Sequence, residues 1–103
     1  MIVVQYTTAV GPDEYDEVVS KIRFHDEPPS GLIMHTAAVT EDGRMRVFDV
    51  WRSLEAHDEF AASRLRPAVV EVVGEERARS DDQRVLQLHS LVTPVGRELT
   101  RGR

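Results

Sequence analysis

Apolar and polar positions along the chain change period several times, and each change marks a predicted element. Residues 2–8 are rich in β-branched and aromatic side chains and predict a strand. Gly11, Pro12 and two acids then mark the start of a helix. Its apolar stripe follows at positions i, i+3, i+4 and i+7, occupied by Tyr15, Val18, Val19 and Ile22. The stripe fades at Phe24, and residues 27–31 predict a loop.

The middle of the chain predicts a β-hairpin and then a second helix. Residues 32–40 and 44–52 have strand character, and Glu41-Asp42-Gly43 between them is typical of a hairpin turn. Ser53 is placed to cap the following helix. The inward side of that helix carries Leu54, His57, Phe60, Ala61, Arg64, Leu65 and Ala68. Pro67 either interrupts it or starts its last turns, and residues 68–73 fit a strand equally well; we predict a helix to Gly74.

The last third of the chain predicts one more strand. Residues 75–82 are charged and resemble a loop, residues 83–92 alternate as a strand does, and residues 93–103 predict a loose tail. The order β-α-β-β-α-β predicts a ferredoxin-like α+β domain over residues 1–92, with a four-stranded antiparallel sheet. Both helices then cover one sheet face, so we expect a second copy of the chain to cover the other and form a homodimer.

Composition excludes several classes of protein. Because there is no cysteine, disulfides, thiolate catalysis and cysteine-bound metals are excluded. The 13 basic residues are outnumbered by 18 acidic ones and form no stripe, so we expect no nucleic-acid partner. No apolar run reaches the roughly 20 residues of a membrane span and no leader is visible, so we expect no membrane partner and a cytoplasmic location. Phosphate loops and nucleotide fingerprints are also missing, and we expect no cofactor.

The register of the hairpin decides which polar side chains meet. If Gly43 takes the left-handed bulge position, Thr40 pairs with Arg44 and His35 pairs with Asp49. One face then carries Ile33, His35, Ala37, Val39, Met45, Val47, Asp49 and Trp51. If Asp42-Gly43 alone forms a two-residue turn, His35 pairs with Val50 and faces away from Asp49. We favour the first register because it makes one face almost wholly apolar.

In that register a His–Asp pair lies beside Trp51, and it is the candidate catalytic site. A neighbouring carboxylate orients an imidazole and fixes its tautomer, as a general base requires, although such a pair is also a common core contact. We expect strands one and three to run parallel, which would bring Tyr6 to the same end of the sheet. His89 on the last strand is expected to face the same cavity. Arg64 is either an anion partner at the pocket edge or a surface charge. The histidines lack metal-binding spacing, so no metal is expected.

One stretch of the sequence resembles a known superfamily. Trp51-Arg52-Ser53-Leu54-Glu55 resembles the Trp-x-Ser-x-Glu junction of the dimeric α/β-barrel superfamily, which includes antibiotic-biosynthesis monooxygenases, heme-degrading monooxygenases and polyketide cyclases. The chain also looks like a group of uncharacterised small actinobacterial proteins, through residues 14–16, 31–38, 49–51, 64–67 and 85–89. The resemblance implies a dimeric barrel. It does not extend to the heme-degrading members, because residues 61–64 hold no histidine where those members carry an iron ligand.

Two interpretations of function follow. In the first, the protein is a cofactor-independent monooxygenase or cyclase that acts on an aromatic or polyketide-like molecule. His35, oriented by Asp49, would remove a proton, while Tyr6 and Trp51 shape the apolar wall and bind the substrate oxygen. In the second, the protein is a non-enzymatic dimer that binds a small apolar ligand or a partner, and the His–Asp pair is structural.

Overall fold

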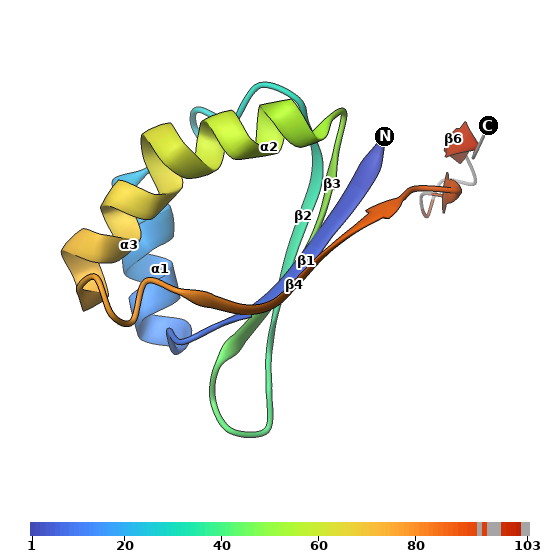
Figure 1. Ribbon diagram of the computed structural model, residues 1–103. Helices are drawn as coiled ribbons and strands as arrows, with labels where there is room; N and C mark the ends of the chain where they lie inside the picture. The colour runs from blue at the N-terminus through green and yellow to red at the C-terminus, as the bar shows by residue number, and fades with distance from the viewer. Residues whose placement is uncertain (93, 95–97, 102–103) are drawn as a thin grey trace.

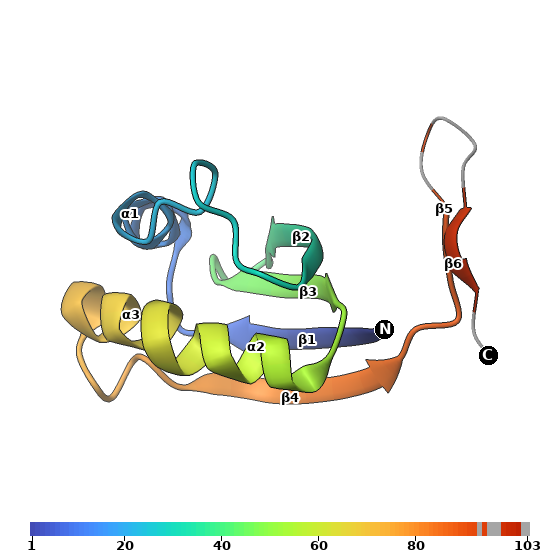
Figure 2. The same cartoon turned by 90° about the horizontal axis from the view of Figure 1, so that it is seen from above.

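Four strands form one antiparallel sheet in the computed structural model, which describes residues 1–92, 94 and 98–101. The strands are β1 (Ile2–Thr8), β2 (Leu32–Val39), β3 (Met45–Trp51) and β4 (Ser80–Gln87), in the order β2-β3-β1-β4. Helix α1 (Pro12–Lys21) and the helical run from α2 (Leu54–Phe60) to α3 (Arg66–Val73) cover the same sheet face (Figures 1 and 2). The predicted ferredoxin-like α+β fold is confirmed.

The hairpin between β2 and β3 adopts the favoured register. Gly43 has a φ of 84°, the left-handed region that glycine enters at low cost. The backbone N–H of Thr40 donates to the Arg44 carbonyl at 2.7 Å, and His35 pairs with Asp49 across the strands. One detail differs: a bulge at Ile33 shifts the pairing, so Leu32 packs against the core where Ile33 was expected.

Strand β1 runs antiparallel to β3, which corrects the expected parallel direction. Val4 lies opposite Asp49, and Tyr6 lies opposite Val47. In the β-α-β-β-α-β topology the strands that run parallel are β1 and β2, and β3 lies between them in the opposite direction. Because side chains alternate along a strand, Tyr6 still shares the face of Val4 and lies diagonally from Asp49.

The second helical segment continues through Pro67, so the helical alternative for residues 68–73 is confirmed. Ser53 caps α2, since its hydroxyl accepts from the Ala56 N–H at 3.1 Å. A π-helical turn, η1 (Ala61–Leu65), precedes α3, and Gly74 ends α3 with a φ of 88°. Proline has no N–H to donate to the preceding turn, and its ring crowds the carbonyl four residues back. The wider turn immediately before Pro67 is consistent with that crowding.

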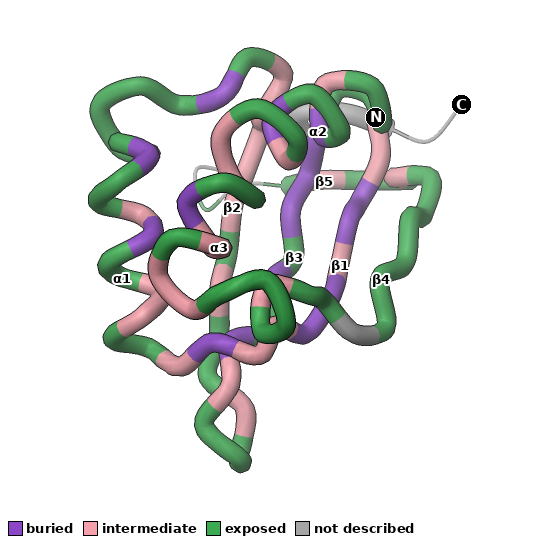
Figure 3. The backbone as a smooth tube through the Cα atoms, turned by 60° about the vertical axis from the view of Figure 1, so that its left-hand side comes forward, coloured by how far each residue is buried: buried purple, intermediate pink, exposed green. Residues whose placement is uncertain are grey.

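Trp51 is the centre of the core between sheet and helices. It is fully buried, as is Val4 beside it, and its ring packs on Phe60 with centroids 5.5 Å apart. Figure 3 shows that β1 and β3 carry much of the buried part of the sheet. Gly31 lets the chain pass close to α2: a Cβ at this position would lie 2.6 Å from Ala56 Cβ, and its φ is already 89°. A residue other than glycine would therefore push α2 away from Trp51.

Strand β4 begins and ends earlier than predicted, and this changes the place of His89. The strand covers Ser80–Gln87, so part of the charged stretch expected as a loop pairs with β1. Charged residues suit β4 because it is an edge strand. His89 follows its end and is exposed, outside the cavity that it was expected to face.

Beyond His89 the chain forms a separate two-stranded sheet from β5 (Ser90–Val92) and β6 (Glu98–Arg101). The loose tail predicted for residues 93–103 therefore contains a paired strand, and the rest of it, apart from Pro94, lies outside the described residues. Figures 1 and 2 show this small sheet standing away from the main one, at the end of the molecule where the N-terminus lies.

Candidate functional site

A His–Asp pair forms the polar floor of the site. His35 Nδ1 lies 2.6 Å from Asp49 Oδ1, and both residues point from neighbouring strands toward the helices. The second carboxylate oxygen, Oδ2, accepts the indole N–H of Trp51 at 3.3 Å. Asp49 is only 4% exposed, so its charge depends on these donors. The predicted neighbourhood of His35, Asp49 and Trp51 is thus present in the structure.

Tyr15 adds a residue that sequence reasoning treated only as part of an apolar stripe. Its hydroxyl lies 2.5 Å from Nε2 of His35, and the two rings are nearly parallel, at 9°. The Phe24 ring also packs against the imidazole of His35, with ring centroids 4.7 Å apart. The sequence offered one indication of this contact. Tyr15 is the first residue of the apolar stripe of α1, and that stripe packs on the sheet face that carries His35.

Hydrogen positions in this chain of contacts follow from the chemistry of the groups. An ionised carboxylate can only accept, so the Nδ1 hydrogen of His35 donates to Asp49. The neutral imidazole then has a lone pair on Nε2, which accepts the hydroxyl hydrogen of Tyr15. Trp51, Asp49, His35 and Tyr15 thus form one continuous series of hydrogen bonds from the core to α1.

Tyr6 contributes a buried phenol with no fixed partner. It is 8% exposed and lines the same cavity, and its hydroxyl makes no hydrogen bond to any described residue. Burial, and then the charge of Asp49, raise the pKa of Tyr6 well above its usual range. The pKa of Tyr15 is also raised, by burial first and then by Asp49 and Asp16. Both hydroxyls therefore keep their hydrogens at neutral pH.

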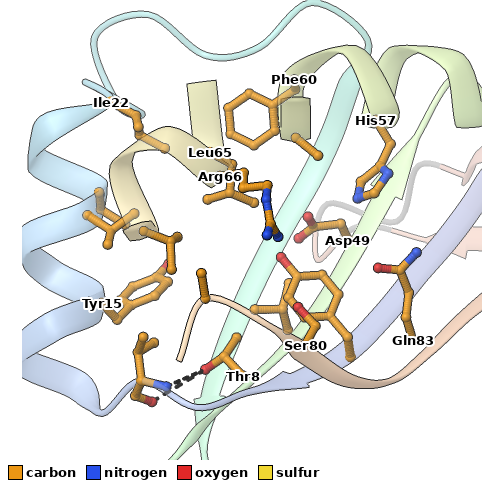
Figure 4. A pocket seen from close by; sticks show the side chains of 18 of the residues that line it. Thr8, Tyr15, Ile22, Asp49, His57, Phe60, Leu65, Arg66, Ser80 and Gln83 are labelled. Atoms are coloured by element: carbon orange, nitrogen blue, oxygen red, sulfur yellow. Dashed lines mark hydrogen bonds between the residues drawn. The ribbon is translucent and has the colours of Figure 1, made fainter. Parts of the chain in front are cut away.

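These groups open onto a cavity of about 410 Å³ between the sheet and the helices. Figure 4 shows Tyr15 reaching in from α1 on one side, with Asp49, His57 and Gln83 across from it. The apolar wall consists of Val10, Val18, Val19, Ile22, Phe24, Val47, Phe60, Ala61, Ala62, Leu65 and Val69. A few polar groups in a mostly apolar enclosure are typical of small-molecule sites.

The mouth of the cavity carries charge of both signs. Arg66 points into it from the start of α3 (Figure 4) and makes one long contact, 3.5 Å, to Glu75. Arg77 is held by two contacts to the carboxylate of Glu14, at 2.6 and 2.8 Å, and a third at 3.0 Å to the Ala9 carbonyl. The hydrogen bonds from Arg77, and then the one from the Gly11 N–H, lower the pKa of Glu14. The contacts of Arg77 join the loop before β4 to the first turn of α1.

Arg64 and His57 have structural contacts. Arg64 lies outside the main cavity, where its guanidinium donates to the carbonyls of Ile22 and Glu27 at 2.6 and 2.7 Å and so closes the end of α1. Of the two alternatives for Arg64, an anion partner at the edge of this cavity is therefore wrong, and its guanidinium binds backbone carbonyls instead. His57 is buried, meets the Trp51 ring edge-on at 5.5 Å and still borders the cavity.

The residues that the structure describes form neither a metal site nor a membrane span. In that part of the chain, no three His, Asp or Glu side chains gather as a metal site would require. Within the same residues, no helix is long and apolar enough to cross a bilayer.

Comparisons with known proteins support the fold. No family model and no curated protein matches the sequence. A conserved protein from Methanosarcina mazei Go1 has a similar structure, with a TM-score of 0.54 and 13% identity over 82% of this chain and 88% of its own. A putative antibiotic biosynthesis monooxygenase from Deinococcus radiodurans has a TM-score of 0.53 and 13% identity, over 82% and 87%. At such identity the likeness is one of fold, and the resemblance to actinobacterial proteins stays a prediction.

Proposed function

We propose that this chain binds a small aromatic or polyketide-like molecule in the cavity between its sheet and helices. The observation that carries the proposal is an apolar cavity of about 410 Å³ that is lined by Tyr6, whose hydroxyl makes no hydrogen bond to a described residue. That hydroxyl can donate to a ligand oxygen while the apolar walls enclose the rest of the molecule. A flat molecule with one or two oxygens and an apolar body fits these walls.

The chemistry that we propose is proton removal without a cofactor, as in a monooxygenase or a cyclase. His35 is the base and Asp49 orients it, while Tyr6 donates to the oxygen on which negative charge develops. The fold is shared with a protein described as a putative antibiotic biosynthesis monooxygenase, which supports this class of reaction by analogy alone.

A second candidate is a binding protein without catalysis. One observation favours it: His35 already has a partner on each ring nitrogen, Asp49 and Tyr15, as a purely structural histidine would. In this candidate the series of hydrogen bonds holds α1 on the sheet, and the cavity stores or presents its ligand unchanged.

We also propose that the protein works as a homodimer through the sheet face that the helices leave bare. Phe48 and Leu86 lie on that face and are 41% and 49% exposed. Met34 is half-buried beside them, whereas Val50 is already buried within the single chain. An identical subunit is the simplest partner for such a face.

A filled-cavity variant tests ligand binding. Ala61→Phe places a ring in the cavity, while Ser63→Phe, in the same π-helical turn but outside the cavity, is the matched control. We expect hydroxylated naphthalenes and anthraquinones to raise the melting temperature of the wild type and of Ser63→Phe, and not that of Ala61→Phe. Equal responses from the two variants would show binding elsewhere. Conversion of a bound compound under air by the wild type, lost in His35→Asn, would separate the enzyme from the binding protein.

A further inference from the structure

We propose that the hydroxyl oxygen of Tyr15 takes the proton from the bound molecule while the hydroxyl hydrogen of Tyr15 moves to Nε2 of His35. The inference rests on the proposed function and identifies the atom that meets the ligand. It also narrows the ligand to a molecule with a weakly acidic O–H, such as a phenol or the enol of a β-dicarbonyl.

The position of Tyr15 carries this assignment. The one lone pair that a neutral His35 can offer is on Nε2, and the Tyr15 hydroxyl occupies it at 2.5 Å. The imidazole is held in that direction, because Asp49 fixes Nδ1 at 2.6 Å and Phe24 packs on the ring. Tyr15 itself lines the cavity. A ligand in the cavity can therefore contact the hydroxyl oxygen of Tyr15, whereas Nε2 of His35 is already occupied by Tyr15.

The hydroxyl oxygen of Tyr15 can accept while its hydrogen is engaged. A phenol oxygen donates one hydrogen and accepts with its lone pairs, and the hydrogen of Tyr15 already points to His35. The acidic hydrogen of a ligand can then approach Tyr15 from the cavity. Asp49 is already engaged on both oxygens, which accept from His35 and from Trp51.

The transfer balances without any further reactant. The O–H bond of the ligand breaks and a new O–H bond forms on Tyr15, while the original O–H bond of Tyr15 breaks and an N–H bond forms on His35 Nε2. The products are a ligand oxyanion, a neutral Tyr15 and an imidazolium beside the Asp49 carboxylate. Tyr15 and Tyr6 can then both donate to the oxyanion, which is the stabilisation that such an anion needs.

Burial of Tyr15 favours this paired movement over a free phenolate. The pKa of Tyr15 is raised by burial and by the nearby charges of Asp49 and Asp16, so loss of its hydrogen alone is disfavoured. Tyr15 stays neutral throughout, because it accepts a hydrogen from the ligand while it gives its own hydrogen to His35. The positive charge arises on His35, directly beside Asp49.

The first test needs no ligand. Nitrogen-15 chemical shifts of His35 report which ring nitrogen carries hydrogen, and we expect Nδ1 protonated and Nε2 accepting, with a change at Nε2 in Tyr15→Phe. Tyr6→Phe is the matched control: it also removes a cavity hydroxyl near Asp49 but makes no contact with His35, so Nε2 should not change. The opposite tautomer in the wild type would overturn the proposal.

The second test uses 4-nitrophenol, whose phenolate absorbs visible light and whose phenol does not. The wild type should bind it with an ionised fraction higher than in free solution at the same pH. Tyr15→Phe should still bind it, with the ratio of phenolate to phenol about tenfold lower, which is one pKa unit. An unchanged ratio in Tyr15→Phe would assign proton removal to another group and leave ligand binding intact. No binding by the wild type of this probe or of the hydroxylated polycycles would overturn the proposed function and this inference together.

Discussion

The indole N–H of Trp51 donates to the carboxylate of Asp49, two residues earlier on the same strand, at 3.3 Å. The most deeply buried aromatic side chain thus fixes the orientation of the acid that orients His35. Core packing and site geometry depend on the same side chain, so a change at Trp51 would alter both.

Asp49→Asn should lower stability although it keeps the shape. The amide offers one acceptor oxygen where the carboxylate offers two, so either His35 or Trp51 loses its acceptor in a buried place. We expect a loss of about 1–3 kcal/mol in urea unfolding. Asp58→Asn, at an exposed position on α2, is the control and should change stability little. Equal stability of Asp49→Asn and the wild type would contradict the buried network.

Gly31→Ala should destabilise the protein more than Gly43→Ala. Both glycines have positive φ, 89° and 84°, so the backbone strain is similar. A Cβ at Gly31 would meet Ala56 Cβ at 2.6 Å, whereas a Cβ at Gly43 would meet nothing within 4 Å. The difference between the two variants should be about 1–3 kcal/mol, the cost of overpacking. Melting curves would measure it, and indistinguishable curves would mean that α2 moves freely.

Glu14 and Arg77 should give the protein a pH-dependent contribution to stability. The pKa of Glu14 is lowered by its hydrogen bonds with Arg77 and the Gly11 N–H. Because the folded pKa lies below the unfolded one, the stabilisation is present above the unfolded pKa and is lost as pH falls through the folded value. Glu14→Gln should lower the melting temperature modestly at pH 7, and this effect should shrink as pH falls below about 4.3, the ordinary glutamate pKa, and vanish once pH is below the folded pKa. A constant difference across that range would rule out a titrating contact.

Phenolate formation in the folded protein should lag behind that of a free tyrosine, whose pKa is about 10. The chain has two tyrosines, Tyr6 and Tyr15, and the pKa of each is raised, chiefly by burial. Stability should be complete below about pH 10 and decline above it, because the unfolded chain ionises first. Ultraviolet titration of the wild type and of each single Tyr→Phe variant measures this. A normal tyrosine step in either variant would place that phenol in solvent.

Phe48→Glu should separate the proposed homodimer. Phe48 lies on the sheet face opposite the helices, so a charge there would be desolvated only if a second copy covers it. Sedimentation at micromolar concentration should show a dimer for the wild type and an 11.7 kDa monomer for the variant. Leu54→Glu, on α2 and equally exposed at 41%, is the control and should remain dimeric. A monomeric wild type would remove the proposal.

The sequence predicted the fold and the His–Asp pair because both depend on local rules. Gly43 takes positive φ cheaply, and the register that makes one sheet face almost wholly apolar is the one that places His35 opposite Asp49. Tyr15 could not be found this way, since its contact with His35 joins residues 20 apart through the docking of a helix on a sheet. The prediction for His89 was wrong because the charged residues at the start of β4 were interpreted as a loop. An edge strand tolerates such charges, so β4 begins earlier and ends before His89.

The π-helical turn at Ala61–Leu65 is a place beside the cavity where the helix could lose one residue without rotating the residues that follow. In a regular helix, one inserted or deleted residue rotates everything that follows by about 100°. A π turn holds an additional residue within the helix, so removing one of its residues would restore regular winding and leave Ala68 directed at the core. Ala61 and Ala62 border the cavity within this turn. A one-residue deletion there would thus reshape the cavity wall that Ala61 and Ala62 form, while the β-strands on the opposite side stayed in place.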